Sequence, residues 1–265
     1  MCLILLAWQA HPQFPLVVAA NRDEFFSRPT AAAEFWNEHP QILAGRDLQA
    51  GGSWMGITRT GRFAALTNFR EPENRQVAAP SRGTLVSDFL AGTLSTEEYL
   101  NNLKTRTAGY RGFNLLCGTL DDGLWHYANR NPSVNANDII QPLAPGIYGI
   151  SNNLLDIPWP KVAQGKSDLA RALTALPHEV PLFDLLHDEQ RHEDALLPRT
   201  GVSLDWERTL SAAFVRAPDY GTRSSTVVKL DRNGFMTFDE QTWLGNAQPG
   251  NRRRFRFRLS GRGAS

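Results

Sequence analysis

The sequence predicts an α+β fold in which antiparallel sheets are covered by segregated helices. Short apolar runs come in pairs near the N-terminus, apolar residues recur at helical spacing in the middle, and the chain closes on further strand-like runs. The chain has 265 residues, 42% of them hydrophobic, and shows no internal repeat or low-complexity linker. We therefore expect one domain that covers residues 1–265.

Two hairpins are predicted in the first quarter of the chain. Residues 3–8 and 16–20 are apolar runs separated by a segment with two prolines, a pattern typical of strands buried on both faces. Residues 53–58 and 62–68 flank a Thr60-Gly61 turn, which indicates a second hairpin.

The remaining elements follow from the same two periodicities. Helical spacing predicts helices over 84–90, 95–103, 161–176 and 182–188. Strand-like runs predict strands at 113–117, 124–127, 147–151, 225–230, 235–238 and 255–259. Ser95 and Glu98 have the spacing of a capping box, and the charged, aperiodic residues 189–199 predict a surface loop.

Composition excludes several classes of protein. The net charge is +1, so no overall field attracts nucleic acid or an anionic membrane. The only two cysteines, Cys2 and Cys117, lack metal-type spacing and indicate a reducing compartment, so we expect a cytoplasmic protein. No run approaches the ~20 apolar residues of a membrane span. We expect no metal site, because His187 and His192 are five residues apart and not four.

Residues 251–259 alternate basic and aromatic side chains and allow two interpretations. Such a pattern can form a stacking surface for single-stranded nucleic acid. It also fits an edge strand with Phe255 and Phe257 inward and arginines outward, where the charges prevent edge pairing. We favour the edge strand and expect no nucleic-acid partner.

Cys2, directly after the initiator methionine, is the first candidate for chemistry. Removal of Met1 would leave a thiol and an α-amine on one residue, and an amine with a pKa of about 7.7–8.0 can accept a thiol proton near neutrality. This is the nucleophile and base of covalent catalysis combined in one residue. The alternative is that Cys2 simply packs in the apolar run that it begins.

Several motifs together resemble the NRDE family, which includes the transport and Golgi organisation 2 type. They are Ala20-Asn-Arg-Asp-Glu-Phe25, Gly52-Ser-Trp-Met-Gly-Ile57, Ala65-Leu-Thr-Asn68, Gly112-Phe-Asn-Leu115, Gly149-Ile-Ser-Asn152 and Gly221-Thr-Arg223. That family is similar to the N-terminal-nucleophile hydrolases of the bile-salt and penicillin-V hydrolase type. The resemblance implies a four-layered α-β-β-α sandwich.

The resemblance also implies roles for individual residues. Cys2 matches the nucleophile, Asp23 the aspartate that holds its amine, Asn68 and Asn152 the oxyanion carboxamides, and Arg223 a late arginine that lowers the thiol pKa. Arg22, Trp54 and Asn153 complete the candidate set as ligand-binding residues. The alternatives are that both asparagines are strand-end turn residues and that Asp23 belongs to an ion-pair cluster with its neighbours.

One departure affects the expected function. The hydrolases carry an arginine three residues before the aspartate, where this chain has Ala20. Arg22 is one residue before Asp23, so strand alternation points its side chain to the face opposite that of Asp23. We therefore favour an intracellular binding and trafficking protein that carries haem as its small-molecule cargo, as the NRDE resemblance implies. The alternative is a cysteine N-terminal-nucleophile amidohydrolase that acts on a small amide, ester or acyl-thioester.

Overall fold

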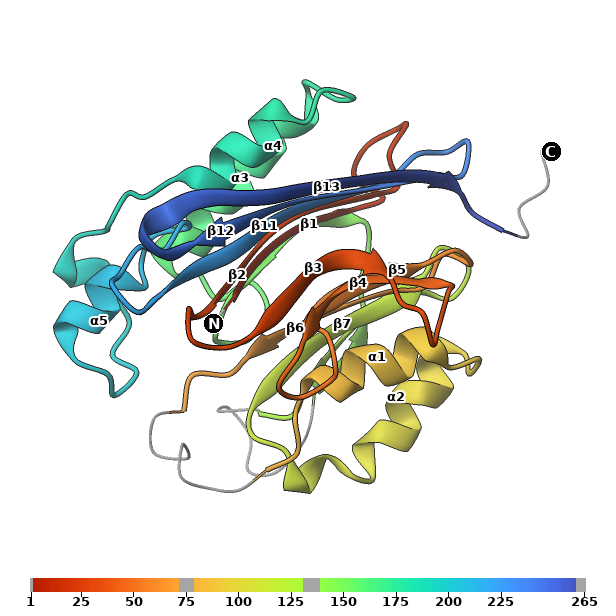
Figure 1. Ribbon diagram of the computed structural model, residues 1–265, viewed down its shortest axis with the longest axis horizontal. Coiled ribbons are helices and arrows are strands. Elements are labelled where there is room, and N and C mark those ends of the chain that lie inside the picture. Colours follow the sequence, from red (N-terminus) through yellow and green to blue (C-terminus); the bar gives the residue numbers. More distant parts are fainter. Residues whose placement is uncertain (1, 72–78, 131–138, 261–265) are drawn as a thin grey trace.

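The computed structural model describes residues 2–71, 79–130 and 139–260 (Figure 1). Thirteen strands and five α-helices lie in these ranges. The strands are β1 (Cys2–Trp8), β2 (Leu16–Phe25), β3 (Thr30–Phe35), β4 (Ile42–Asp47), β5 (Met55–Thr58), β6 (Phe63–Asn68), β7 (Phe113–Thr119), β8 (Gly123–Ala128), β9 (Ile139–Pro142), β10 (Gly146–Ile150), β11 (Tyr220–Leu230), β12 (Phe235–Leu244) and β13 (Gln248–Arg258). The helices are α1 (Gly83–Ala91), α2 (Thr96–Lys104), α3 (Pro160–Leu173), α4 (Val180–Asp184) and α5 (Leu204–Thr209).

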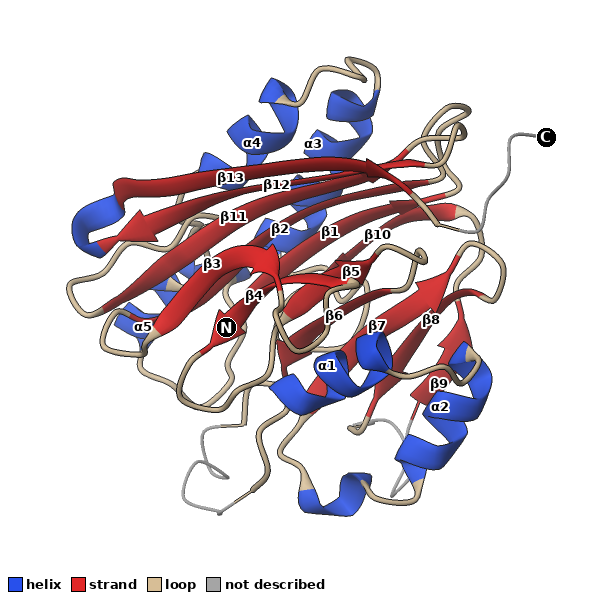
Figure 2. Ribbon diagram, turned by 45° about the vertical axis from the view of Figure 1, so that its right-hand side comes forward, coloured by secondary structure: helices blue, strands red, loops and turns tan. Residues whose placement is uncertain are grey.

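The strands form two antiparallel sheets that face each other (Figure 2). The first sheet has six strands in the order β10-β1-β2-β11-β12-β13. The second has seven strands in sequence order from β3 to β9. The first sheet therefore joins the N-terminal hairpin to strands from the second half of the chain, through the pairs β1 with β10 and β2 with β11.

Strand β1 shows how sequence determines the layers. All seven of its residues are buried, as the continuous apolar run predicts. Its even-numbered residues, such as Ile4 and Leu6, belong to the core between the sheets, and the odd-numbered Leu3 and Leu5 belong to the core under the helices. The period of two along a strand thus divides one run between two cores.

Helices cover the outer face of each sheet. Helix α3 packs on β1 and β10, whereas α1 and α2 pack on the second sheet. A side chain at Gly165 of α3 would meet Leu5 at 2.8 Å, so glycine allows this close helix–sheet approach. The layers run helix, sheet, sheet, helix, which confirms the predicted α+β sandwich.

Several elements differ from the sequence-based prediction. Strands β3, β4 and β9 and helix α5 were not predicted. Strand β3 contains three alanines and a glutamate, residues that strands disfavour, and is held by tertiary contacts: Ala33 N–H donates to Glu240 Oε1 of β12 at 2.7 Å. Strand β13 begins at Gln248, well before the predicted 255, and lies at the sheet edge with its arginines largely exposed.

The helices agree more closely with their prediction. The Ser95 and Glu98 capping box is present at the start of α2, and α3 ends at Leu173, three residues before the predicted end. Residues 189–199 are irregular apart from a 3-10 turn at Asp194–Leu196. None of the helices in the described ranges has the length and apolar character needed to span a bilayer.

Candidate active site

A cavity of about 620 Å³ lies at the N-terminal end of β1. Its lining combines Cys2 of β1, Arg22 of β2, Asn68 of β6 and Arg82 just before α1, so both sheets contribute. We call it the Cys2 cavity.

Cys2 lies directly opposite Arg22 across the first hairpin. Paired residues of neighbouring strands place their side chains on one face of a sheet, so the thiol and the guanidinium share the face toward the second sheet. Cys2 is buried, with 6% of its surface exposed. Burial raises the pKa of the Cys2 thiol; the charge of Asp23 adds to this, whereas the charge of Arg22 and a hydrogen bond from the Asp23 backbone N–H oppose it. The thiol needs a base before it can act as a nucleophile.

Asp23 directs its side chain to the opposite face of β2. Thr222 Oγ1 donates to Asp23 Oδ1 at 2.8 Å, and the Tyr220 hydroxyl donates to the Asp23 carbonyl oxygen at 3.1 Å. Burial raises the pKa of the Asp23 carboxyl, and among the side chains the Lys161 ammonium of α3 opposes this most. Lys161 is itself buried, which lowers its pKa to about 8. A buried carboxyl and a buried amine therefore lie on the face of the first sheet that is opposite to the Cys2 thiol.

The side chain of Asn152 contacts the backbone of Asn68. Asn152 Nδ2 donates to the Asn68 carbonyl oxygen at 2.8 Å. Ser151 Oγ donates to the Cys2 carbonyl oxygen at 3.0 Å and contacts Asn152 Oδ1 at 3.3 Å. The structure thus brings Cys2, Asn68 and Asn152 together through the end of β10, and of these three Cys2 and Asn68 line the cavity.

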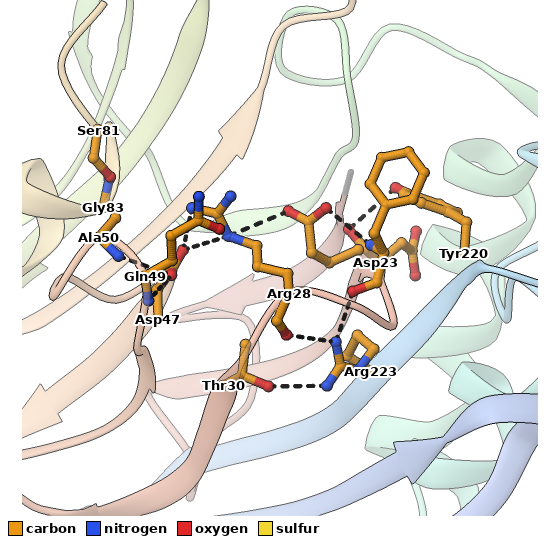
Figure 3. Close-up of polar contacts among 12 residues, drawn as sticks. Asp23, Arg28, Thr30, Asp47, Gln49, Ala50, Ser81, Gly83, Tyr220 and Arg223 are labelled. Carbon is orange, nitrogen blue, oxygen red and sulfur yellow. Dashed lines mark hydrogen bonds and ion pairs between the residues drawn. The ribbon is translucent and has the colours of Figure 1, made fainter.

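Arg223 also lines the cavity, but both of its Nη atoms donate to the segment between β2 and β3 (Figure 3). It lies at a bulge in β11, between the pairs Thr222 with Asp23 and Ser224 with Arg22. Its Nη1 donates to the carbonyl oxygens of Phe25 at 2.8 Å and Arg28 at 3.0 Å, and its Nη2 donates to Thr30 Oγ1 at 3.1 Å. Arg223 therefore holds the turn between β2 and β3, and Arg22 is the arginine opposite the thiol.

The other two candidate ligand-binding residues differ in position. Trp54 lines the Cys2 cavity and packs against the core between the sheets. Asn153 instead accepts a hydrogen bond from Leu154 N–H at 2.8 Å through Oδ1, and its carbonyl oxygen accepts one from Asn114 Nδ2 at 2.9 Å. Asn153 thus stabilises the turn after β10 and is not part of the cavity lining.

The structure adds charged residues that the sequence reasoning did not single out. Arg28 bridges Asp47 of β4, at 2.7 Å, and Glu24, at 4.0 Å, along one wall of the cavity (Figure 3). Arg82, just before α1, lines the cavity, whereas Lys161 of α3 interacts with Asp23 on the other face of the first sheet. Glu24 alone carried a sequence signal, as the neighbour of Asp23 in the Asn-Arg-Asp-Glu motif.

Metal-binding groups are sparse near this site. The described residues contain no cluster of three or more His, Cys, Asp or Glu side chains placed to hold a metal ion. Among the described residues that line the cavity there is no histidine, and Cys2 is the only sulfur ligand.

The chain has relatives in animals. It is 36% identical over 269 residues to a Transport and Golgi organization protein 2 homolog of Bos taurus, covering 93% of this chain and 94% of that protein. It is also 36% identical over 265 residues to the homolog of Homo sapiens, covering 92% and 94%. These matches extend over nearly the full length of both partners.

Solved structures share the fold at low identity. A Caenorhabditis elegans N-acylethanolamine-hydrolyzing acid amidase ortholog superposes with a TM-score of 0.52 at 12% identity, covering 85% of this chain and 92% of that chain. A mutant of the conjugated bile acid hydrolase from Clostridium perfringens gives a TM-score of 0.52 at 10% identity, covering 99% and 94%. Both are N-terminal-nucleophile hydrolases, and they confirm the fold that the motifs implied.

Family membership follows from a match to most of the chain. The model for Transport and Golgi organisation 2 matches residues 1–245, which contain all of the motifs that indicated the NRDE family. The chain therefore belongs to the Transport and Golgi organisation 2 family, on an N-terminal-nucleophile hydrolase fold.

Proposed function

We propose that this protein is a cysteine amidohydrolase that binds a small acyl compound in the Cys2 cavity. The observation that carries the proposal is the position of the Cys2 thiol, on a cavity wall with Arg22 and Asn68 and linked through Ser151 to Asn152. The activities named for the two solved relatives, hydrolysis of N-acylethanolamines and of conjugated bile acids, support it. Both cysteines are free thiols, which supports a cytoplasmic location.

The proposed reaction uses the mature N-terminus as its base. After removal of Met1, the α-amine of Cys2 takes the thiol proton, and the thiolate attacks the carbonyl carbon of the substrate. The side-chain amides of Asn68 and Asn152 donate to the oxyanion. The C–N bond then breaks, the leaving amine takes the proton from the α-ammonium, and water hydrolyses the thioester to release the acid and restore the thiol.

Arg22 can supply the positive charge that the hydrolases have where this chain has Ala20. Positions 20 and 22 lie on the same face of β2, because side chains alternate with a period of two. Arg22 pairs directly with Cys2, and its positive charge favours the thiolate. A guanidinium therefore lies on the face of the strand where the hydrolases place theirs.

Intact-mass analysis and an acyl-substrate screen test the proposal. We expect a mature chain that begins at Cys2 and turns over N-acyl amides, with an acyl-thioester trapped on Cys2 after rapid acid quench. Asn68→Ala should lower kcat by about 10²-fold or more, as loss of one oxyanion donor does. Retained Met1, or turnover that survives Cys2→Ala, would contradict the mechanism.

The second candidate is the haem carrier. A single soft ligand, the Cys2 thiol, lies in a cavity of about 620 Å³ beside Trp54 and Trp243, and a thiolate can serve as an axial haem ligand. Haemin titration separates the two candidates. A saturable Soret shift that is lost in Cys2→Ala, without turnover of acyl substrates, would support the carrier in place of the hydrolase.

A further inference from the structure

Two arginines from different layers face the Cys2 cavity without a carboxylate partner. Arg22 is nine-tenths buried, and among the residues that the structure describes its guanidinium makes no hydrogen bond or ion pair. The Glu240 carboxyl interacts electrostatically with Arg22, but its Oε1 already accepts from the Ala33 N–H at 2.7 Å. A buried cation is costly unless it is paired, so this arrangement suits a partner that arrives with the ligand.

Arg82 provides the second cation from the side of α1. Its Nη1 donates to the Gly112 carbonyl oxygen at 2.8 Å, and no carboxylate of the described residues lies within ion-pair distance. Burial lowers the pKa of Arg82 to about 10, and the positive charge of Arg111 on the same wall adds to the shift. An anion bound beside Arg82 would offset both the cost of burying this guanidinium and its repulsion by Arg111.

The backbone around Arg82 is closely packed, and its place at a helix N-terminus favours negative charge. Arg82 is the N-cap of the nine-residue helix α1, whose first turn contains no acidic residue, and helix N-termini attract anions. A side chain at Gly52 would meet the Gly83 carbonyl carbon at 2.4 Å, and Ser53 N–H donates to the Gly83 carbonyl oxygen at 3.2 Å. The start of the helix is thereby fixed beside the loop that carries Trp54.

We propose that Arg22 and Arg82 form an anion-binding subsite in the Cys2 cavity for a carboxylate or phosphate group of the ligand. Cys2 lies within the electrostatic reach of both guanidinium groups, so the anionic group would sit close to the attacked carbonyl. The statement that an acyl group is attacked beside this subsite rests on the proposed function. Anion binding itself requires no turnover. The substrate class is an acyl compound with a nearby acidic group, not a neutral amide.

Binding to the Cys2→Ala protein tests the subsite without chemistry. Calorimetry with benzoate, phenyl phosphate and the uncharged benzamide should show binding of one or both anions and weaker binding of the amide. The two anions separate carboxylate from phosphate recognition. Arg22→Gln and Arg82→Gln should each weaken anion binding about tenfold or more, which is the usual effect of losing a hydrogen bond to a charged group.

Arg46→Gln is the matched control. Arg46 also lines the cavity, but its guanidinium is ion-paired with Glu38 and lies over the Trp36 ring. This variant should leave anion binding unchanged, and Arg82→Lys should retain part of it because the charge remains. Anion affinity that is absent, that survives both glutamine variants, or that falls equally in Arg46→Gln would overturn the subsite.

Kinetics distinguish failure of the subsite from failure of the proposed reaction. In the protein with native Cys2, Arg82→Gln should raise KM for N-benzoylglycine, and should lower kcat/KM more for this acidic substrate than for the neutral N-ethylbenzamide. Anion binding that depends on Arg22 and Arg82, without turnover of either amide, would retain the subsite and reject the hydrolase. Turnover of the amides without anion binding that depends on Arg22 and Arg82 would retain the hydrolase and reject the subsite.

Discussion

The buried ion pair between Arg70 and Glu207 yields a quantitative prediction for Glu207→Gln. Only 4% of each side chain is exposed, and Arg70 Nη1 lies 2.6 Å from Glu207 Oε2. The second carboxylate oxygen accepts from Thr200 N–H at 2.9 Å and Thr200 Oγ1 at 2.7 Å. Every partner is a donor, so a glutamine must turn its NH₂ group toward at least one of them.

The expected loss follows from these contacts. The substitution removes at least one hydrogen bond to a charged group and leaves the Arg70 guanidinium buried without a counterion. Loss of one partner of a buried pair costs about 3–5 kcal/mol, so we expect the free energy of unfolding to fall by about 3 kcal/mol or more. Because Arg70 N–H donates to the Asn152 carbonyl oxygen at 2.9 Å, the variant should also loosen the candidate oxyanion site.

Equilibrium unfolding in guanidinium chloride, followed by tryptophan fluorescence, measures this loss. Asp194→Asn is the control in the same segment, because its ion pair with Arg208 is exposed and should contribute little. The double variant Arg70→Met/Glu207→Leu should recover much of the stability, since neither charge remains. A Glu207→Gln protein as stable as Asp194→Asn would refute the assignment of a strong buried pair.

Three further predictions concern protonation, reactivity and capping. Burial lowers the pKa of His126 from 6.5 to about 4, so the unfolded chain binds more protons between these values; stability should fall by up to roughly 3 kcal/mol as pH drops through that window, and urea titrations of His126→Gln should lack this component. Iodoacetamide should label native Cys2 before Cys117, whose thiol is fully buried with a raised pKa; peptide mass spectrometry that finds the reverse order would contradict this. Ser95→Ala removes the cap of α2 and should lower stability by about 1 kcal/mol in the same unfolding assay, whereas an unchanged midpoint would show that the cap contributes nothing.

Local patterns were sufficient for the elements whose burial is encoded in their own residues. The continuous apolar run of β1 predicted a strand buried on both faces, and Ser95 with Glu98 predicted the start of α2. Strand β3 could not be predicted in this way, because its alanines favour no strand and its Ala33 N–H donates to Glu240, 207 residues further along the chain. The early part of β13 is likewise defined by its partner β12.

The same distinction applies to the candidate site. Cys2 and Asp23 could be proposed from their motifs, and strand register then places Arg22 opposite the thiol. The direction of Arg223 depends on a bulge in β11 that sequence alternation does not encode. Arg82 lies just outside a helix with no motif of its own, and only packing of α1 brings it to the cavity.

The strand order of the first sheet has a consequence for synthesis of the protein. Strand β2, which carries Arg22 and Asp23, pairs on one side with β1 and on the other with β11, which begins only at Tyr220. During synthesis on the ribosome, the apolar edge of β2 therefore stays unpaired until more than four-fifths of the chain has been made. Such edges promote aggregation, so we expect the nascent chain to need chaperones during this interval.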